Sequence, residues 1–197
     1  MLDTTQGIKE GSKEWWKAKY ESKDWLYGKA PSDFLSKHLD FLRKGQILDV
    51  AMGEGRNACY LASKGFGVEG LDFCEVAVGR AQKLGGEMKV KLEAKVANLD
   101  FFLVPLMKYN SIVVIDYHPS PTFYNALTRG LAEGGTLLVE GYTTEQLKIP
   151  DGPKVEFFEC FKSNELIGHI RSLKLLYYSE IRQGNLSKVY CIAKKVL

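Results

Sequence analysis

Short apolar runs rich in β-branched residues alternate, from residue 46 onward, with stretches that place apolar residues at helical spacing. The apolar runs predict strands at 46–50, 67–71, 89–97, 111–115 and 136–140. The helical stretches predict helices at 56–64, 75–84 and 122–131, the second of them stopped by Gly85 and Gly86. Strands and helices alternating at this spacing indicate right-handed crossovers, and therefore a mostly parallel sheet with helices on both faces.

The last third of the chain breaks this rhythm. A short helix is predicted at 163–170, and two strand-like runs follow at 173–181 and 187–196. Their connection through Gln183-Gly184-Asn185 is too short for a crossover helix, so the two strands are predicted to form an antiparallel hairpin. We therefore predict one α/β domain over 1–197, with a helical prefix at 1–44 and a sheet core at 45–197.

The composition is that of an ordinary globular domain. Of 197 residues, 45% are hydrophobic, 26% charged and 12% aromatic, which excludes a disordered, collagen-like or coiled-coil chain. No apolar run approaches the roughly 18 residues of a membrane span, and the N-terminus lacks the features of a signal peptide. A cytoplasmic protein without a membrane partner is therefore expected.

Two further classes of protein are excluded: nucleic-acid binders by the charge pattern, and metal-binding proteins by the spacing of the cysteines and histidines. The net charge of +3 comes from interspersed signs, without the basic block of a nucleic-acid binder. The four cysteines and three histidines lack the spacing of metal ligands. We therefore expect reduced thiols, no metal and no nucleic-acid partner.

A glycine-containing loop joins the first predicted strand to the first predicted helix. Gly53 and Gly55 allow a tight turn and let a ligand approach the N–H groups at the helix start, and their spacing also matches a dinucleotide-binding fingerprint. Asp49 distinguishes between ligands, because a carboxylate at the end of a buried strand is costly without a partner. It would repel a pyrophosphate, whereas it would attract the amino group and sulfonium of S-adenosylmethionine.

Two more polar residues follow the next two predicted strands. Asp72 ends the second strand, where it can accept hydrogen bonds from both hydroxyls of a ribose. Asn98 follows the third strand, where its amide can pair with the edge of an adenine. Each acid alone is also compatible with a helix cap or a surface charge. Three polar groups at successive strand ends favour a nucleoside site.

Several segments resemble a known family. The loop at 49–57, the strand end Gly70-Leu71-Asp72, the segment 131–135, which ends in a turn predicted at 133–135, and the closing hairpin are similar to class I S-adenosylmethionine-dependent methyltransferases. Within that superfamily they resemble the small tellurite-resistance and thiopurine-type enzymes, as does the prefix pattern Tyr20-x4-Trp25-x-Tyr27-Gly28-x-x-Pro31. The resemblance extends from about residue 13 to the end. It implies a Rossmann-like, doubly wound sheet of seven strands whose last strand is antiparallel, in agreement with the predicted hairpin.

The resemblance implies S-adenosylmethionine as the cofactor. Asp49, Gly53 and Gly55 would line its methionine moiety, while Arg56 and Asn57 would start the helix beneath the loop. Arg56 could also meet the methionine carboxylate. The implied reaction is methyl transfer by in-line displacement to a small-molecule acceptor.

The ribose and adenine are assigned in the same way. Asp72 would bind the ribose, and Asn98 with Leu99 the adenine. The chain departs from the family at Ala51, where a glycine is usual, and at Asn98, where Asp is commoner. The complete predicted cofactor set is Asp49, Ala51, Gly53, Gly55, Arg56, Asn57, Asp72, Phe73, Asn98, Leu99 and Asp116.

The fourth strand ends in Asp116-Tyr117-His118-Pro119, at the edge where methyl transfer would occur. His118 and Tyr117 are the candidate catalytic residues, with His118 as general base for an oxygen or nitrogen acceptor. A histidine that caps the next helix or packs is the alternative, and a thiolate acceptor needs no base. Amino-methyltransferases acting on nucleobases carry Asp/Asn-Pro-Pro-aromatic at this place, which the tetrapeptide does not match.

The prefix is rich in aromatic residues. The sequence is compatible with two roles for them, packing in the core and forming a lid over the active site. Trp16 and Tyr20 share one helix face, which is typical of core, yet aromatic faces also stabilise a cation such as a sulfonium. Two alternatives to an active enzyme also remain: a non-catalytic cofactor-binding or partner-binding domain and a nicotinamide oxidoreductase.

Overall fold

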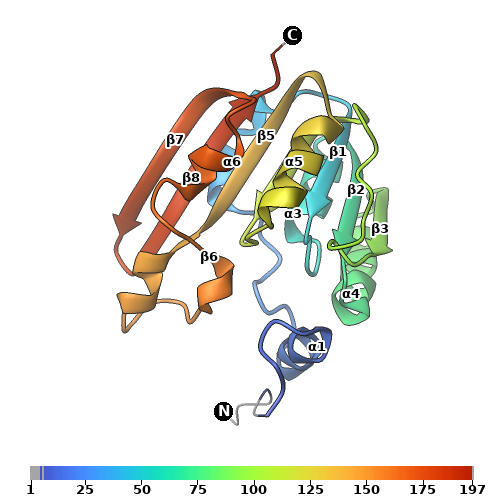
Figure 1. Cartoon of the computed structure of the whole chain (residues 1–197). Coiled ribbons are helices and arrows are strands. Elements are labelled where there is room, and N and C mark those ends of the chain that lie inside the picture. Colours follow the sequence, from blue (N-terminus) through green and yellow to red (C-terminus); the bar gives the residue numbers. More distant parts are fainter. Residues whose placement is uncertain (1–4, 6, 197) are drawn as a thin grey trace.

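The computed structural model describes residues 5 and 7–196, and its centre is a sheet of eight strands (Figure 1). The strands are β1 (Gln46–Val50), β2 (Gly67–Asp72), β3 (Leu92–Val96), β4 (Tyr109–Ile115), β5 (Leu131–Thr143), β6 (Cys160–Phe161), β7 (Lys174–Gln183) and β8 (Leu186–Lys194). The helices are α1 (Lys13–Ser22), α2 (Asp33–Lys37), α3 (Arg56–Ser63), α4 (Glu75–Glu87), α5 (Pro121–Gly130) and α6 (Glu165–His169). The 3-10 turns are η1 (Leu39–Phe41), η2 (Thr144–Lys148) and η3 (Phe157–Glu159).

The strand order is β3-β2-β1-β4-β5-β8-β7, with β6 paired to β5 outside this path. Strands β1 to β6 pair in parallel, whereas β8 is antiparallel to both β5 and β7. The seven predicted strands and the C-terminal hairpin are therefore confirmed. The two-residue β6 is an additional strand, too short to give a periodic signal in the sequence.

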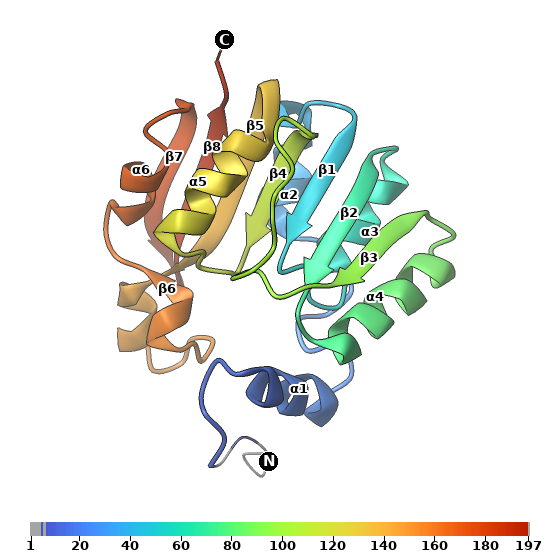
Figure 2. The same cartoon turned by 45° about the vertical axis from the view of Figure 1, so that its right-hand side comes forward.

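Two apolar clusters cover the two faces of the sheet, because successive residues of a strand point to opposite sides. Leu48 and Val50 pack with the apolar residues of α5 and α6. Ile47 packs on the other face with residues of α2, α3 and α4. Figure 2 shows α5 and α6 in front of the sheet, with α3 behind it. The doubly wound architecture is confirmed.

Two predicted boundaries are wrong. Helix α4 continues through Gly85 and Gly86 to Glu87. The helix persists because its buried face, with Ala81, Leu84 and Gly85, stays packed. This packing outweighs the roughly 1 kcal/mol that each glycine costs a helix. The predicted turn at 133–135 lies inside β5, which starts directly after α5 and shows a register shift opposite Tyr109.

The prefix helix α1 lies beyond the edge of the sheet toward which the arrowheads of β1 and β2 point (Figure 2). It belongs to a third, small cluster in which Tyr20 packs with Cys74 and Ala77 of the α4 region. Helix α1 starts at the cap Ser12, whose hydroxyl accepts from the Trp15 backbone N–H. The prefix is therefore docked on the sheet edge without contributing a strand.

The four cysteines are buried free thiols distributed over the fold. Cys59 lies in α3, Cys74 is the N-cap of α4, Cys160 lies in β6 and Cys191 in β8. Burial raises the pKa of all four, to about 11 for Cys59 and about 12 for Cys191.

Within the described part of the chain, no helix has the length and hydropathy of a membrane span.

Candidate active site

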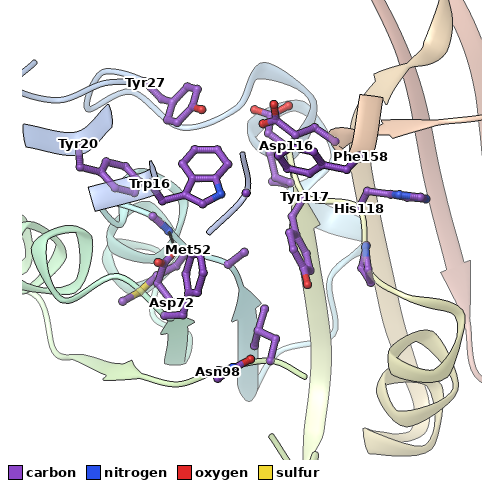
Figure 3. A pocket seen from close by; sticks show the side chains of 18 of the residues that line it. Trp16, Tyr20, Tyr27, Met52, Asp72, Asn98, Asp116, Tyr117, His118 and Phe158 are labelled. Atoms are coloured by element: carbon purple, nitrogen blue, oxygen red, sulfur yellow. Dashed lines mark hydrogen bonds between the residues drawn. The ribbon is translucent and has the colours of Figure 1, made fainter. Parts of the chain in front are cut away.

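A cavity of about 640 Å³ opens at the carboxyl edge of the parallel strands (Figure 3). Its walls come from the loops after β1, β2, β3 and β4, from the prefix and from η3. Eleven of the thirteen predicted site residues line it: Ala51, Gly53, Arg56, Asn57, Asp72, Phe73, Asn98, Leu99, Asp116, Tyr117 and His118. Parallel strands bring these residues together because their carboxyl ends meet at one edge.

The loop after β1 turns through three residues in the left-handed region. Ala51 has a φ of 53°, Gly53 of 56° and Gly55 of 82°, so Ala51 adopts the conformation for which glycine is favoured. A Cβ on Gly53 would lie 3.0 Å from the Tyr20 hydroxyl oxygen. A Cβ on Gly55 would lie 2.7 Å from the Ala81 Cβ. Gly55 does not line the cavity, and its missing side chain makes room for α4.

Asp49 lies beneath this loop, 2% exposed, and is not part of the cavity wall. Its Oδ2 atom is buried without a hydrogen-bond partner among the described residues. Burial raises the pKa of Asp49 to about 7, and the charge of Asp72 adds to the rise, while Arg56 and the Ala58 N–H oppose it. A buried carboxylate held this way favours a cation in the cavity above it.

Asp72 fixes the geometry of the site at the end of β2. Its Oδ2 accepts a hydrogen bond of 2.9 Å from the Gly53 backbone N–H, and its Oδ1 accepts one of 2.9 Å from the Cys74 N–H. Burial raises its pKa although these N–H groups oppose the rise. Each carboxylate oxygen has a second lone pair, so Asp72 can still accept hydrogen bonds from a ligand in the cavity.

Asn98 and Leu99 form the part of the wall predicted to hold the adenine, and Phe73 lines the same cavity. Asn98 is exposed, and its Oδ1 accepts a hydrogen bond of 2.9 Å from the Asp100 N–H. Leu99 is buried within the core cluster on the α5 face. The local turn therefore fixes the amide of Asn98 at the edge of an apolar surface, an arrangement that suits a planar base.

A chain of ion pairs leads from Arg56 and Asp116, which line the cavity, to Lys188 and Glu140. The Arg56 Nη2 atom lies 3.0 Å from Asp116 Oδ2, and the Lys188 Nζ atom lies 2.7 Å from Asp116 Oδ1 and 2.6 Å from Glu140 Oε1. Ser32 donates its hydroxyl hydrogen bond to Glu140. Burial opposes the protonated form of Lys188, but the charges of Asp116 and Glu140 raise its pKa. The chain of pairs fixes the end of β4 to β5 and β8.

Arg56, for which a contact with the methionine carboxylate is predicted, already has protein partners. Its guanidinium is already engaged, since Nη1 also donates to the Ala30 carbonyl at 3.3 Å. Asn57 accepts from the Ser32 N–H at 2.9 Å through Oδ1, so it anchors the chain leading from the prefix. Both residues start α3 as predicted, but in this structure their polar groups bind protein partners.

The two catalytic candidates also lie in the cavity wall. The ring of His118 meets Phe161 edge-on at 4.4 Å, and its Nε2 lies 3.3 Å from Glu165 Oε1 without hydrogen-bond alignment. Burial raises the pKa of Tyr117 to about 12, with smaller effects from Asp100 and Asp72. Tyr117 therefore keeps its proton at neutral pH and can donate a hydrogen bond.

The wall formed by η3 was not predicted from the sequence. Phe158 and Glu159 of η3 line the cavity, and Tyr27 and Trp16 line it from the prefix. Figure 3 shows the side chains of Phe158, Tyr27 and Trp16 there. Trp15 is buried, and its ring meets Phe158 at 6.0 Å. Among the prefix rings, some are therefore core and some face the site. An acid directly after two phenylalanines was the only sequence signal for η3.

The sheet order, the reversed hairpin and the edge site define the fold of class I S-adenosylmethionine-dependent methyltransferases. The resemblance predicted from sequence is thereby confirmed, and S-adenosylmethionine is the cofactor of this class. The family model of the tellurite resistance protein TehB matches residues 11–191, so the chain belongs to the TehB family.

Solved structures show the same fold at low sequence identity. TehB from Haemophilus influenzae is 17% identical with a TM-score of 0.71, and the match covers 93% of this chain and 66% of that protein. A methyltransferase from Methanosarcina mazei is 20% identical with a TM-score of 0.62, covering 81% and 96%. A protein that converts a disulfide bond into a thioacetal group during echinomycin biosynthesis is 15% identical with a TM-score of 0.72, covering 94% and 93%. No curated protein sequence matches the chain.

Asp49 is expected to make stability depend on pH. Its pKa of about 7 in the folded state exceeds its ordinary value of 3.8, so folding favours the protonated form, and stability is lost as the pH rises through this window. Asp49→Asn removes this titration. The free energy of unfolding of the variant, relative to that of the wild type, should therefore increase by roughly 2–4 kcal/mol between pH 4 and pH 8. Urea unfolding measures this, with the exposed Asp100→Asn as control. Parallel pH profiles of wild type and Asp49→Asn would contradict the prediction.

Proposed function

We propose that the chain transfers the methyl group of S-adenosylmethionine to a small-molecule acceptor held between the β4 loop and η3. The main observation in support of this proposal is that one continuous cavity extends from Asp72 and Asn98 to His118 and Glu159. Its volume of about 640 Å³ lies within the range of small-molecule sites. One cavity therefore offers space for a nucleoside at one end and a second molecule at the other.

The residues of the nucleoside end fit this cofactor. The Oδ2 atom of the buried Asp49 has no hydrogen-bond partner among the described residues, so a positive charge above it would stabilise the carboxylate. Asp72 retains lone pairs that can accept hydrogen bonds from two ribose hydroxyls. Asn98, Leu99 and Phe73 would hold the adenine. Bound S-adenosylmethionine supplies a methyl group already activated by its sulfonium.

The remaining residues orient the acceptor, since alignment is the main requirement for this reaction. Tyr117 can donate a hydrogen bond from its hydroxyl. The negative charge of Glu165, 3.3 Å from Nε2 of His118 although not aligned for a hydrogen bond, would favour the proton on that nitrogen. Nδ1 would then accept the proton of a hydroxyl or amine acceptor. The prefix rings would exclude water above the reacting atoms.

The proposal is tested by binding and turnover. Calorimetry with S-adenosylmethionine and S-adenosylhomocysteine, in the presence of EDTA, should show binding of both. A labelled methyl group should then appear on members of a panel of thiol, amine and hydroxyl acceptors. Binding without single-turnover methylation of any acceptor would favour a non-catalytic cofactor-binding domain instead. No binding at millimolar ligand would refute the proposal.

Asp72→Ala is expected to weaken cofactor binding by about 1.5–3 kcal/mol, the range for hydrogen bonds to a charged group. Calorimetry gives this difference directly. Asp100→Ala is the matched control, because Asp100 also lines the cavity but is exposed at its rim. Equal affinities of Asp72→Ala and the wild type would show that Asp72 does not reach the ribose.

A further inference from the structure

The end of the cavity beyond the cofactor loops combines carboxylates with aromatic rings. Asp116 and Tyr117 follow β4, Phe158 and Glu159 belong to η3, and Tyr27 comes from the prefix. Figure 3 shows Tyr27, Asp116 and Phe158 on one side of the cavity, with Trp16 between them and Met52 and Asp72. The charge that this end presents to an acceptor depends on which of these groups are already paired.

Among the described residues, two cations line the cavity, Lys9 and Arg56. Lys9 is exposed, whereas Arg56 is partly buried and already paired. Its guanidinium is bound to Asp116 and to the Ala30 carbonyl. The four charges of this chain of pairs, on Arg56, Asp116, Lys188 and Glu140, sum to zero, and the Lys188 side chain is only 8% exposed. An oxyanion would have to displace Asp116 to reach Arg56, which would leave a buried carboxylate without one of its two cations.

Glu159 is not neutralised in this way. It is 9% exposed, and within the described part of the chain it makes no ion pair. The Glu156 N–H donates to its Oε2 at 2.8 Å within the capping box of η3, which fixes the carboxylate in the wall. Burial raises its pKa, partly opposed by that N–H and by the charge of Lys19. Lys19 itself lies over the Trp15 ring, 3.6 Å from its centroid.

Tyr27 shows that the acids act on this end of the cavity. Burial raises the pKa of its hydroxyl, and the charges of Glu159 and Asp116 raise it further. The phenol therefore stays neutral and presents its ring and its O–H. Tyr27 and Phe158 are partly exposed to the cavity, at 44% and 42%, and aromatic faces attract cations.

A fixed, unpaired carboxylate among aromatic rings is the arrangement that recognises a cation. We propose that this end of the cavity selects a methyl acceptor carrying a cationic group, such as a protonated amine on an aromatic or aliphatic frame, and that Glu159 is the residue that sets this preference. Oxyanions, including the tellurite of the family's name, are then disfavoured at this end. The inference rests on the proposed function and specifies its acceptor class.

Two probes that differ in charge test the preference. Tyramine and 4-hydroxyphenylacetate share a phenol ring but carry an ammonium and a carboxylate. Each is titrated into the full chain saturated with S-adenosylhomocysteine, and binding is followed by calorimetry and by ligand-observed NMR. Tyramine should bind at least about tenfold more tightly than the anion, as expected for a hydrogen-bonded charge, and tellurite should not bind at millimolar concentration.

Glu159→Gln keeps the acceptor for the Glu156 N–H and removes only the charge, so it should abolish the preference between the probes. Glu156→Gln is the matched control, because it removes a charge from the same turn outside the cavity wall and should leave the preference intact. Tighter binding of the anion, binding of neither probe, or an unchanged preference in Glu159→Gln would overturn the proposal. The wild-type comparison remains decisive if the variant does not fold.

Glu159 could instead serve the sulfonium of the cofactor, and a second comparison separates the roles. S-adenosylhomocysteine lacks that positive charge, so a sulfonium role predicts that Glu159→Gln weakens S-adenosylmethionine much more than S-adenosylhomocysteine. We expect unchanged affinity for both, and a selective loss would overturn the proposal. Failure of the wild type to bind either cofactor would instead contradict the proposed function.

Discussion

A chain that begins at Lys29 is expected to fold but to lose methyl transfer and most of its cofactor affinity. Among residues 5 and 7–196, none before Phe34 belongs to the two large clusters that cover the sheet, whereas Tyr20 belongs to the small third cluster. The polar contacts of the prefix include ion pairs such as Lys13–Glu75, whose side chains are largely exposed, and such pairs contribute little to stability. Removing the prefix therefore opens the cavity while the sheet keeps its core, so that water reaches the site.

Gly28 gives this segment a means of moving. Its φ of 73° lies in the left-handed region, and no heavy atom of the described residues beyond its chain neighbours lies within 4 Å of where a Cβ would be. A lid hinged here predicts that hydrogen-exchange protection of residues 13–28 rises when cofactor is added. Circular dichroism and calorimetry of the truncated chain complete the test. An unfolded truncation, or high protection that ignores cofactor, would show that the prefix is a passive part of the core.

His118→Asn is expected to lower turnover of a hydroxyl or amine acceptor by about 10²–10⁴-fold while cofactor affinity stays unchanged, which is the usual range for losing a general base. The physical reason is that Asn cannot accept and release a proton at neutral pH. Single-turnover rates with labelled cofactor measure the effect, and calorimetry measures the affinity.

His169→Asn is the matched control for this variant. His169 also lies near Glu165, 3.5 Å from its Oε1, but its ring stacks on Tyr124 and does not line the cavity. Turnover should therefore survive in His169→Asn. If His118→Asn is equally active, His118 is a packing residue against Phe161, and a thiol acceptor that needs no base becomes the better assignment.

The part of the cavity that we propose to bind the nucleoside could be predicted because it depends on local order alone. A buried strand followed by a loop and a helix places its last polar residue at one edge of a parallel sheet. Asp49, Asp72 and Asn98 each followed such a run, so their convergence required no knowledge of distant contacts. The left-handed Gly53 and Gly55 were predicted by the same logic.

The acceptor end depends on contacts far apart in sequence. Lys188 lies between Ser187 and Val189 in β8 and meets Asp116 only because β8 pairs antiparallel with β5. Glu159 reaches the cavity because the two-residue β6 pairs with β5 immediately after η3. Neither arrangement leaves a periodic pattern in the sequence, so the pairing of Arg56 and the acidic wall emerged only from the structure.

The four buried thiols lie in different parts of the fold, so their reaction with a labelling reagent can show which part of the chain opens. A thiol reacts as its thiolate and only when reagent can reach it, so each cysteine stays silent until the segment covering it separates. Cys74 lies under the prefix in the cluster of Tyr20, whereas Cys59 and Cys191 belong to α3 and β8. Labelling kinetics at single sites can therefore resolve a breathing motion of the prefix from global unfolding, in the unmodified sequence and without an added fluorophore.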